Sequence, residues 1–176
     1  MTDLDLRDAV ASDIPVLHRL IESAYRGETS RAGWTTEADL LDGQRTDPEE
    51  LADILADPDQ AILTGWRAGV LVASVLIARR EEGTGYFGML SVEPTLQSSG
   101  LGRRMVSAAE TALTTRFGAR RVRIQVFPQR GTLIAWYNRL GYSDTGQTVP
   151  FPYDQPRLGL PLRDDLYFIA MEKVLP

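Results

Sequence analysis

Runs of apolar residues separated by short polar turns predict a series of strands along much of the chain. Three runs, 61–66, 70–79 and 85–92, follow one another closely and are joined by a few residues of turn type. Because such short connections suit antiparallel neighbours, we expect hairpins here. The other predicted strands are 4–10, 122–127, a strand from residue 142 onward, and 167–173.

Apolar residues at helical spacing predict helices between these strands. A first helix follows Ser12-Asp13, a candidate N-cap with proline two residues later, and carries an apolar stripe over 16–24. A longer helix is predicted over 101–117, with Gly118 as its C-terminal cap. Two short helical pieces are expected between the first helix and the first hairpin, near 37–41 and 48–56.

The helix over 101–117 also indicates how its flanking strands lie. It carries the chain from the strand 85–92 to the strand 122–127, and such a crossover implies parallel or near-parallel pairing. The pattern therefore predicts an α/β fold. With 176 residues, 43% of them hydrophobic, one globular domain spanning residues 1–176 has enough material for a full core.

The turn between that strand and that helix is a candidate phosphate site. It reads Gln97-Ser98-Ser99-Gly100-Leu101-Gly102-Arg103-Arg104, and a glycine-rich turn opening a helix offers unpaired N–H groups at the positive end of a helix dipole. Arg103 and Arg104 oppose that dipole unless a bound anion compensates them. A tight turn that only permits close packing is the alternative. The glycine spacing fits neither a P-loop nor a dinucleotide fold.

Two motifs together resemble those of the GNAT N-acetyltransferase superfamily. Val92-x-Pro94 followed by Gln97-x-x-Gly100-x-Gly102 is similar to the family's acetyl-CoA signature. Residues 135–142, Ala-Trp-Tyr-Asn-Arg-Leu-Gly-Tyr, resemble its second motif, a helix that carries a tyrosine and ends at glycine before an aromatic strand. The resemblance covers roughly residues 4–173. It implies the GNAT fold, a mixed, mostly antiparallel sheet of about six or seven strands, flanked by helices and splayed at the central strands.

The resemblance also implies a reaction and its residues. Acetyl-CoA would be the cosubstrate, and the acetyl group would pass directly from the thioester to a primary amine of a small molecule. Tyr137 would be the acid that protonates the departing thiolate, with a core position as the alternative. The implied acetyl-CoA-binding residues are Leu90, Ser91, Val92, Gln97, Ser98, Ser99, Gly100, Leu101, Gly102, Arg103 and Arg104.

One position departs from the family pattern. Relatives often place an asparagine seven residues before the motif tyrosine to contact the pantetheine, and Arg130 stands there in this chain. Arg130 is therefore a candidate phosphate ligand, and Asn138 is a neighbouring candidate for the pantetheine contact.

The sequence defines the general base and the acceptor site less well. Some relatives use a carboxylate at the start of the strand before the phosphate loop, but Tyr86 stands there. Glu93, at the other end of that strand, is the candidate base, with a solvated turn carboxylate as the alternative. Other carboxylates that could reach an acceptor, none of them privileged, are Glu22, Glu28, Glu37, Asp39 and Asp42. Trp34 is a candidate acceptor-binding residue because a tryptophan is unusual in a polar loop and could hold the acceptor chain, and Glu37 is one because relatives use the N-terminal helical region to cover the acceptor. Tyr86 is a third candidate. A core position is equally open to Trp34.

Charge and composition narrow the function classes. A formal net charge of -5 argues against nucleic acid or an anionic membrane as the partner, because both need clustered cations, and it suits an amine substrate. The chain has no cysteine, which excludes an acyl-cysteine intermediate and thiolate-bound metal, and we expect no metal cofactor. Acidic residues at the N-terminus and a longest apolar run of only 70–78 predict a cytoplasmic protein.

Three questions stay open at this point. A non-catalytic acetyl-CoA-binding module would keep the phosphate turn without using the acid. A protein-lysine or N-terminal acetyltransferase would differ only in the acceptor. The resemblance is also compatible with a homodimer, since many relatives pair through edge strands or C-terminal hairpins.

Overall fold

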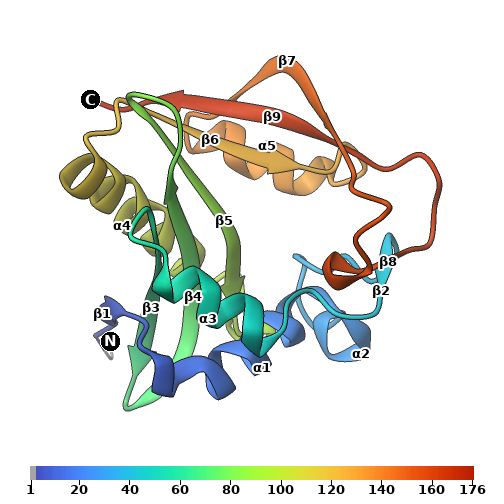
Figure 1. Cartoon of the computed structure of the whole chain (residues 1–176). Helices are drawn as coiled ribbons and strands as arrows, with labels where there is room; N and C mark the ends of the chain where they lie inside the picture. Colours follow the sequence, from blue (N-terminus) through green and yellow to red (C-terminus); the bar gives the residue numbers. More distant parts are fainter. Residues whose placement is uncertain (1–2) are drawn as a thin grey trace.

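The computed structural model describes residues 3–176 and contains a splayed, mostly antiparallel sheet with helices on both faces (Figure 1). The sheet has seven strands in the order β1-β3-β4-β5-β6-β9-β7, and β5–β6 is its one parallel pair. The strands are β1 (Asp5–Asp8), β3 (Gln60–Arg67), β4 (Val70–Arg79), β5 (Thr84–Val92), β6 (Arg121–Val126), β7 (Ser143–Pro150) and β9 (Tyr167–Val174). β2 (Leu41–Asp42) and β8 (Leu160–Pro161) form a separate antiparallel pair. The predicted fold class, hairpins and parallel pair are confirmed.

Helices cover the two faces of the sheet with different sets of apolar residues. Leu17 and Leu51, from α1 and α3, pack with Ile62 of β3 on one face. Met105, from α4, and Leu133, from α5, belong to the larger core on the other face. No helix within residues 3–176 is long and apolar enough to cross a bilayer. The helices are α1 (Ile14–Tyr25), α2 (Gly27–Ser30), α3 (Pro48–Ala56), α4 (Leu101–Phe117) and α5 (Gly131–Arg139), with 3-10 turns at Ala11–Asp13, Pro94–Leu96 and Pro156–Leu158.

The helix expected at 37–41 is wrong. These residues form turns that lead into β2. A short helix that was not predicted, α2, lies earlier in the chain. The physical reason is tertiary: the Glu37 N–H donates to the Tyr25 carbonyl, and its carboxylate is buried between two arginines. Asp13 precedes α1 as predicted, but its carboxylate accepts from Arg7 and from the Val10 N–H instead of capping the helix.

The central strands diverge soon after they pair. β5 and β6 are in register only from Thr84↔Arg121 to Tyr86↔Arg123, and Figure 1 shows them separating beyond that point. β5 also carries an irregularity, with Met89 at a φ of 47° where its register with β4 shifts. Beyond Tyr86, the edge of β5 that faces β6 therefore has no strand partner within residues 3–176, although side chains already reach the carbonyls of Leu90 and Val92.

Candidate active site

The glycine-rich turn leaves a row of backbone N–H groups without protein partners. Gly100, with a φ of 85°, precedes α4, and Ser98 also has a positive φ of 68°. The Arg104 N–H donates to the Gly100 carbonyl. Within residues 3–176, none of the N–H groups of residues 98–103 donates to a protein acceptor. The turn thus presents unpaired donors at the positive end of a helix of seventeen residues, which suits an anion.

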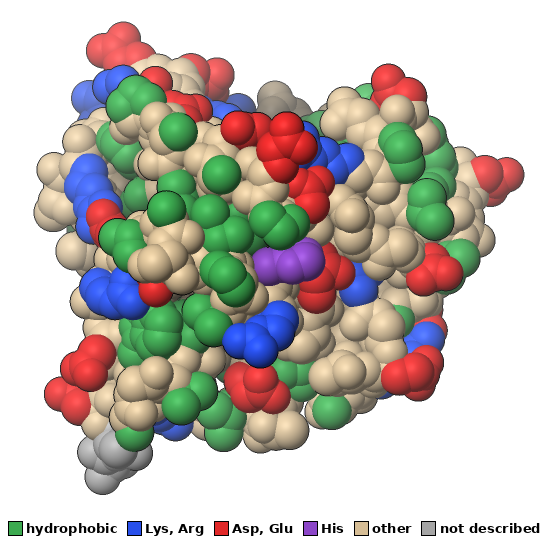
Figure 2. All heavy atoms as spheres, turned by 60° about the horizontal axis from the view of Figure 1, so that its bottom comes forward, with side chains coloured by type: hydrophobic (Ala, Val, Ile, Leu, Met, Phe, Trp, Pro, Cys, Tyr) green, Lys and Arg blue, Asp and Glu red, His purple; other side chains and the backbone are tan. Residues whose placement is uncertain are grey.

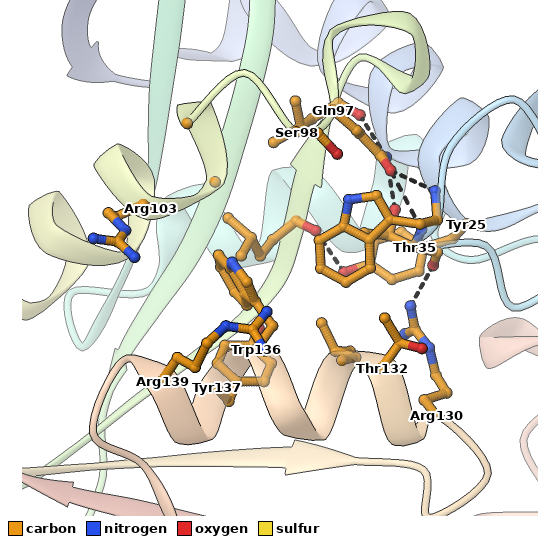
Figure 3. A pocket seen from close by; sticks show the side chains of 16 residues that line it. Tyr25, Thr35, Gln97, Ser98, Arg103, Arg130, Thr132, Trp136, Tyr137 and Arg139 are labelled. Carbon is orange, nitrogen blue, oxygen red and sulfur yellow. Dashed lines mark hydrogen bonds between the residues drawn. The ribbon is translucent and has the colours of Figure 1, made fainter.

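A cavity of about 540 Å³, the loop cavity, lies between this turn and α5 (Figure 3). Figure 3 shows Arg103 of α4 and Arg139 of α5 on the same side of it, so two cations border the turn. The side chains of Trp34 and Trp136 meet edge to face across it, with ring centroids 5.8 Å apart. Its lining residues are Tyr25, Trp34, Thr35, Leu90, Val92, Gln97, Ser98, Gly100, Gly102, Arg103, Arg130, Thr132, Leu133, Trp136, Tyr137 and Arg139.

The Gln97 side chain fastens one wall of the loop cavity. Its carbonyl oxygen accepts the Trp34 N–H at 2.8 Å and the Thr35 N–H at 3.3 Å, and its amide nitrogen donates to the Thr35 hydroxyl at 2.7 Å (Figure 3). The amide also reaches the Val92 carbonyl. Gln97 therefore joins the phosphate turn to the segment after α2, and Trp34, predicted at the acceptor, lies at the loop cavity.

A second cavity of about 570 Å³, the sheet cavity, lies between the diverging strands, α1, α3 and the loop after β7. Glu37 and Tyr86, two of the predicted acceptor-binding residues, both line it. Its charged lining residues are Arg26, Glu37, Arg45, Glu50, Arg80 and Arg130. The residues that line both cavities are Tyr25, Leu90, Arg130, Leu133 and Tyr137.

Tyr137 therefore stands where the two cavities meet. Its ring is buried against Trp136, Tyr142 and Phe87, with centroids 4.9, 5.7 and 6.1 Å away. Within residues 3–176, no hydrogen bond involves its hydroxyl. Burial raises the pKa of Tyr137 far above its ordinary value, so the phenol stays protonated at neutral pH. The buried ring of Tyr137 is consistent with a role in core packing, and its protonated hydroxyl is consistent with a role as a general acid.

Tyr25, which the sequence did not single out, also borders both cavities. Its hydroxyl donates to the Leu90 carbonyl at 2.7 Å and holds the end of α1 on the irregular part of β5. Burial raises the pKa of Tyr25 to about 12. Tyr25 follows Ile21 by one helical turn, at the end of the apolar stripe, so its position alone does not distinguish it from a core residue.

Glu37 lies between two buried arginines. Its carboxylate accepts from Arg26 at 2.7 Å and from Arg130 at 3.1 Å, and Arg130 also donates to the Thr35 carbonyl (Figure 3). Burial alone would raise the pKa of Glu37, but Arg130, Arg26 and Arg45 outweigh it and hold that pKa below its ordinary value. Glu37 is therefore a fixed anion, and the Arg130 guanidinium is committed to it.

Several predicted residues lie outside both cavities. Glu93 borders a separate hollow beside Val16 and Arg19 of α1. Arg104 faces the outer side of α4 and pairs with Asp3 at 3.6 Å, unlike its neighbour Arg103. Asn138 is exposed, because neighbouring positions on a helix face different directions and Tyr137 points inward.

Other predicted acetyl-CoA contacts can involve the backbone only. The hydroxyl of Ser91 donates to the Met89 carbonyl, and that of Ser99 donates to the Leu96 carbonyl. The Leu101 side chain is buried in the core. The side chains of these residues point away from the loop cavity, so a contact with acetyl-CoA through their backbone stays a prediction.

The surface around α1 shows no broad basic patch. His18, the chain's one histidine, is half-buried with its Nε2 3.9 Å from Glu22, and it lines neither cavity. On the face in Figure 2, acidic and basic side chains are interspersed.

Several solved acetyltransferases share the fold of this chain. The ribosomal-protein-S18-alanine N-acetyltransferase from Escherichia coli superposes with a TM-score of 0.69 at 14% identity, over 98% of this chain and 94% of that one. The spermidine N-acetyltransferase from Vibrio cholerae, solved with CoA and spermine, gives 0.70 at 15% identity, over 97% and 95%. A nourseothricin acetyltransferase gives 0.69 at 17% identity, over 99% and 100%.

These likenesses establish the fold, and the family follows from the sequence. No curated protein matches the chain in sequence. The model of the acetyltransferase (GNAT) family matches residues 20–142, which include both motifs and the residues that separate the two cavities. The chain therefore belongs to the GNAT family of acetyltransferases and is an acyltransferase.

Proposed function

We propose that the chain transfers acetyl directly from acetyl-CoA, bound in the loop cavity, to the primary amine of a small molecule bound in the sheet cavity. The observation that carries this proposal is the position of Tyr137, whose side chain lines both cavities and whose hydroxyl has no hydrogen-bond partner within residues 3–176. A transferase needs two binding sites that meet at a proton donor, and this boundary provides them.

The loop cavity suits the donor for reasons of chemistry. The unpaired N–H groups of residues 98–103 would hold the pyrophosphate, with Arg103 and Arg139 beside them. The edge of β5 at Leu90 and Val92, which no strand covers within residues 3–176, would pair with the amides of the pantetheine arm, as the family resemblance implies. The pantetheine would share the two carbonyls with Tyr25 and Gln97 or replace these contacts. The bound acetyl-CoA supplies an activated thioester carbonyl.

Tyr137 acts as the acid in this proposal. The amine nitrogen attacks the thioester carbonyl carbon, the carbon–sulfur bond breaks, and the departing thiolate takes the phenol proton. The nitrogen, cationic after the attack, releases one proton to water, and the Tyr137 phenolate regains a proton from water, which restores the acid. Because burial keeps the phenol protonated, the proton is available at neutral pH. Burial in the same cavity also makes the thiolate more basic, which favours the transfer.

No carboxylate in the sheet cavity has the features of a free base near neutral pH. Glu37 is held ionised between arginines, and Glu50 accepts from the Thr46 hydroxyl. Glu93 borders neither cavity, which leaves its predicted base role without structural support. We infer that the amine enters in its neutral form or loses its proton to water.

The size of the sheet cavity supports a small acceptor. The segment around β2 is tied to the loop after β7 by the β2–β8 pair, by Arg26 to the Leu158 carbonyl, and by Arg157 to Asp47. These contacts leave a space of about 570 Å³, within the usual range for small ligands. Among the structural neighbours, the Vibrio enzyme is a spermidine acetyltransferase and the Escherichia coli enzyme modifies a ribosomal protein, so both acceptor classes occur on this fold.

The test is thiol release from acetyl-CoA with a panel of amines, amino acids, antibiotics and basic peptides, alongside calorimetry of acetyl-CoA. We expect micromolar binding and release with one class of small amines. Release with peptides alone would favour a protein acetyltransferase. Binding without release across the panel would favour the non-catalytic module, and absence of binding would refute the proposed donor site.

A further inference from the structure

The sheet cavity carries more positive than negative charge, although the whole chain is acidic. Four arginines and two glutamates line it. Glu37 is shared between Arg26 and Arg130, so one anion serves two cations. The imbalance is unexpected for a site that receives an amine, since like charges repel in a cavity of low dielectric.

The two remaining arginines, Arg45 and Arg80, act on carboxylates through their charges only, Arg45 on Glu37 and Arg80 on Asp57. Within residues 3–176, neither Arg45 nor Arg80 forms an ion pair or a side-chain hydrogen bond. Each lies over a tyrosine of the same cavity: Arg45 is 5.4 Å from the ring centre of Tyr25, and Arg80 is 4.7 Å from that of Tyr86. Stacking orients a guanidinium while its N–H donors stay available to a ligand.

Hydrogen bonds from the backbone N–H groups hold the main chain of both arginines in place. The Arg45 N–H donates to the Glu22 carboxylate at 2.8 Å, and the Arg80 N–H donates to the Thr84 carbonyl at 3.0 Å. Burial raises the pKa of Tyr86, and the charges of Arg45 and Arg80 both act to lower it. The two charges, which come from segments 35 residues apart, therefore act at one phenol within the cavity.

We propose that the acceptor carries a carboxylate or phosphate in addition to its amine, and that Arg45 and Arg80 bind this anionic group. The inference rests on the proposed function and narrows its substrate class to anionic amines, such as amino acids, and away from polyamines. Guanidinium groups match the oxygens of such anions with paired hydrogen bonds. The positive lining would also lower the pKa of the acceptor's ammonium, which favours the neutral nucleophile where a carboxylate base is missing.

The experiment compares acceptors that differ only in the anion. Amino acids are tested against their amides, and O-phosphoethanolamine against ethanolamine, with spermidine as a polycation. We expect kcat/KM to favour the anionic member of at least one pair by about tenfold or more. A carboxylate preference and a phosphate preference would be told apart by which pair responds. Equal rates within every pair, or a preference for spermidine, would overturn the proposal.

Variants locate the effect. Arg45→Gln and Arg80→Gln, singly and together, should reduce the acid-to-amide ratio towards one while leaving acetyl-CoA binding by calorimetry unchanged. Arg79→Gln is the matched control, because Arg79 neighbours Arg80 but pairs with Asp59 and lies outside the cavity. A ratio that survives in the double variant would refute the assignment.

Failure of the proposed function has a different signature. If the wild-type protein releases no thiol with any amine, the transferase proposal fails, and the anion site is then judged by binding alone. Calorimetry of phenylalanine against phenylalaninamide, with CoA present, should still favour the acid and lose that preference in the double variant. Equal binding of the two would overturn the anion site as well.

Discussion

Tyr137 is the residue whose substitution separates chemistry from binding. Replacing it with phenylalanine removes the proton donor and leaves the ring packing against Phe87, Trp136 and Tyr142. We expect Tyr137→Phe to lower kcat by about tenfold or more with little change in acetyl-CoA affinity. Steady-state kinetics and calorimetry measure the two effects.

A second tyrosine provides the control for this substitution. Tyr167 is exposed at the start of β9 and lines neither cavity, so Tyr167→Phe should leave both quantities unchanged. If Tyr137→Phe turned over at the wild-type rate, the phenol would have no part in the reaction and its burial would be a matter of packing.

Glu37 should matter for stability through its charge. Glu37→Gln leaves Arg26 and Arg130, which are 4% and 10% exposed, without their shared anion, and breaking a buried pair costs about 3 kcal/mol or more. Urea unfolding at pH 7 measures this loss. Glu28→Gln is the control, because Glu28 is exposed and solvent screens its pair with Arg31, so this substitution should leave the stability almost unchanged.

The same variant makes a prediction about pH. Because the folded pKa of Glu37 is lowered, its contribution is complete above the unfolded value of about 4.3 and is lost as the pH falls through the folded value. The stability gap between wild type and Glu37→Gln should therefore be full at pH 7 and narrow below about pH 4. A gap that is constant from pH 7 to pH 3 would contradict the role of the carboxylate's charge.

At the scale of elements, the start of α4 combines a helical glycine with a cavity wall. A methyl group at Gly102 would meet the Trp136 ring at 3.4 Å, and both residues line the loop cavity. Alanine favours the helix by up to about 1 kcal/mol, so we expect Gly102→Ala to raise the melting temperature while weakening acetyl-CoA binding about threefold or more.

The first helical residue of α5 offers the matched comparison. A methyl group at Gly131 would meet nothing within 4 Å, and Gly131 borders neither cavity. Gly131→Ala should give the helical gain without the loss of affinity. Equal affinities in the two variants would mean that the donor does not approach the turn closely.

Helices and strands with a continuous local pattern could be predicted from the sequence. A segment whose structure depends on contacts with distant residues could not. The helices at 48–56 and 101–117 and the strand at 70–79 have the predicted bounds, because apolar periodicity and turn residues specify each within its own segment. The segment 37–41 also resembles a helix locally, but Glu37 is buried between Arg26, which follows α1, and Arg130, which precedes α5. The contact between Glu37 and Arg130 joins residues 93 positions apart, so no pattern within the segment 37–41 indicates it.

At the scale of the whole molecule, the same distinction applies to the site. The phosphate turn is contiguous, so its residues and its chemistry could be recognised together. The proposed anion site is assembled from Arg45 and Arg80, on either side of β3 and β4 in sequence, against tyrosines from α1 and β5. Nothing in a single segment signals that these side chains share a cavity, and the splay of the sheet brings them together.

The loop cavity draws on three distant parts of the chain, so a donor bound there should stabilise the whole fold. Its walls come from 25–35, 90–103 and 130–139. A ligand present at a hundred times its Kd adds about 2.7 kcal/mol of stability, which raises the melting temperature of a protein of this size by about 5 to 10 °C. Acetyl-CoA should produce this shift in a thermal unfolding scan.

Acetyl-pantetheine separates the parts of that effect. It offers the thioester and the pantetheine arm to β5 but has no pyrophosphate for the N–H groups of residues 98–103. At the same concentration it should give a clearly smaller shift, because the row of donors that no protein group satisfies would stay without an anion. Equal shifts in melting temperature from the two compounds would mean that the glycine-rich turn does not bind phosphate. Its unpaired N–H groups would then be no more than the ordinary unpaired donors at the start of a helix.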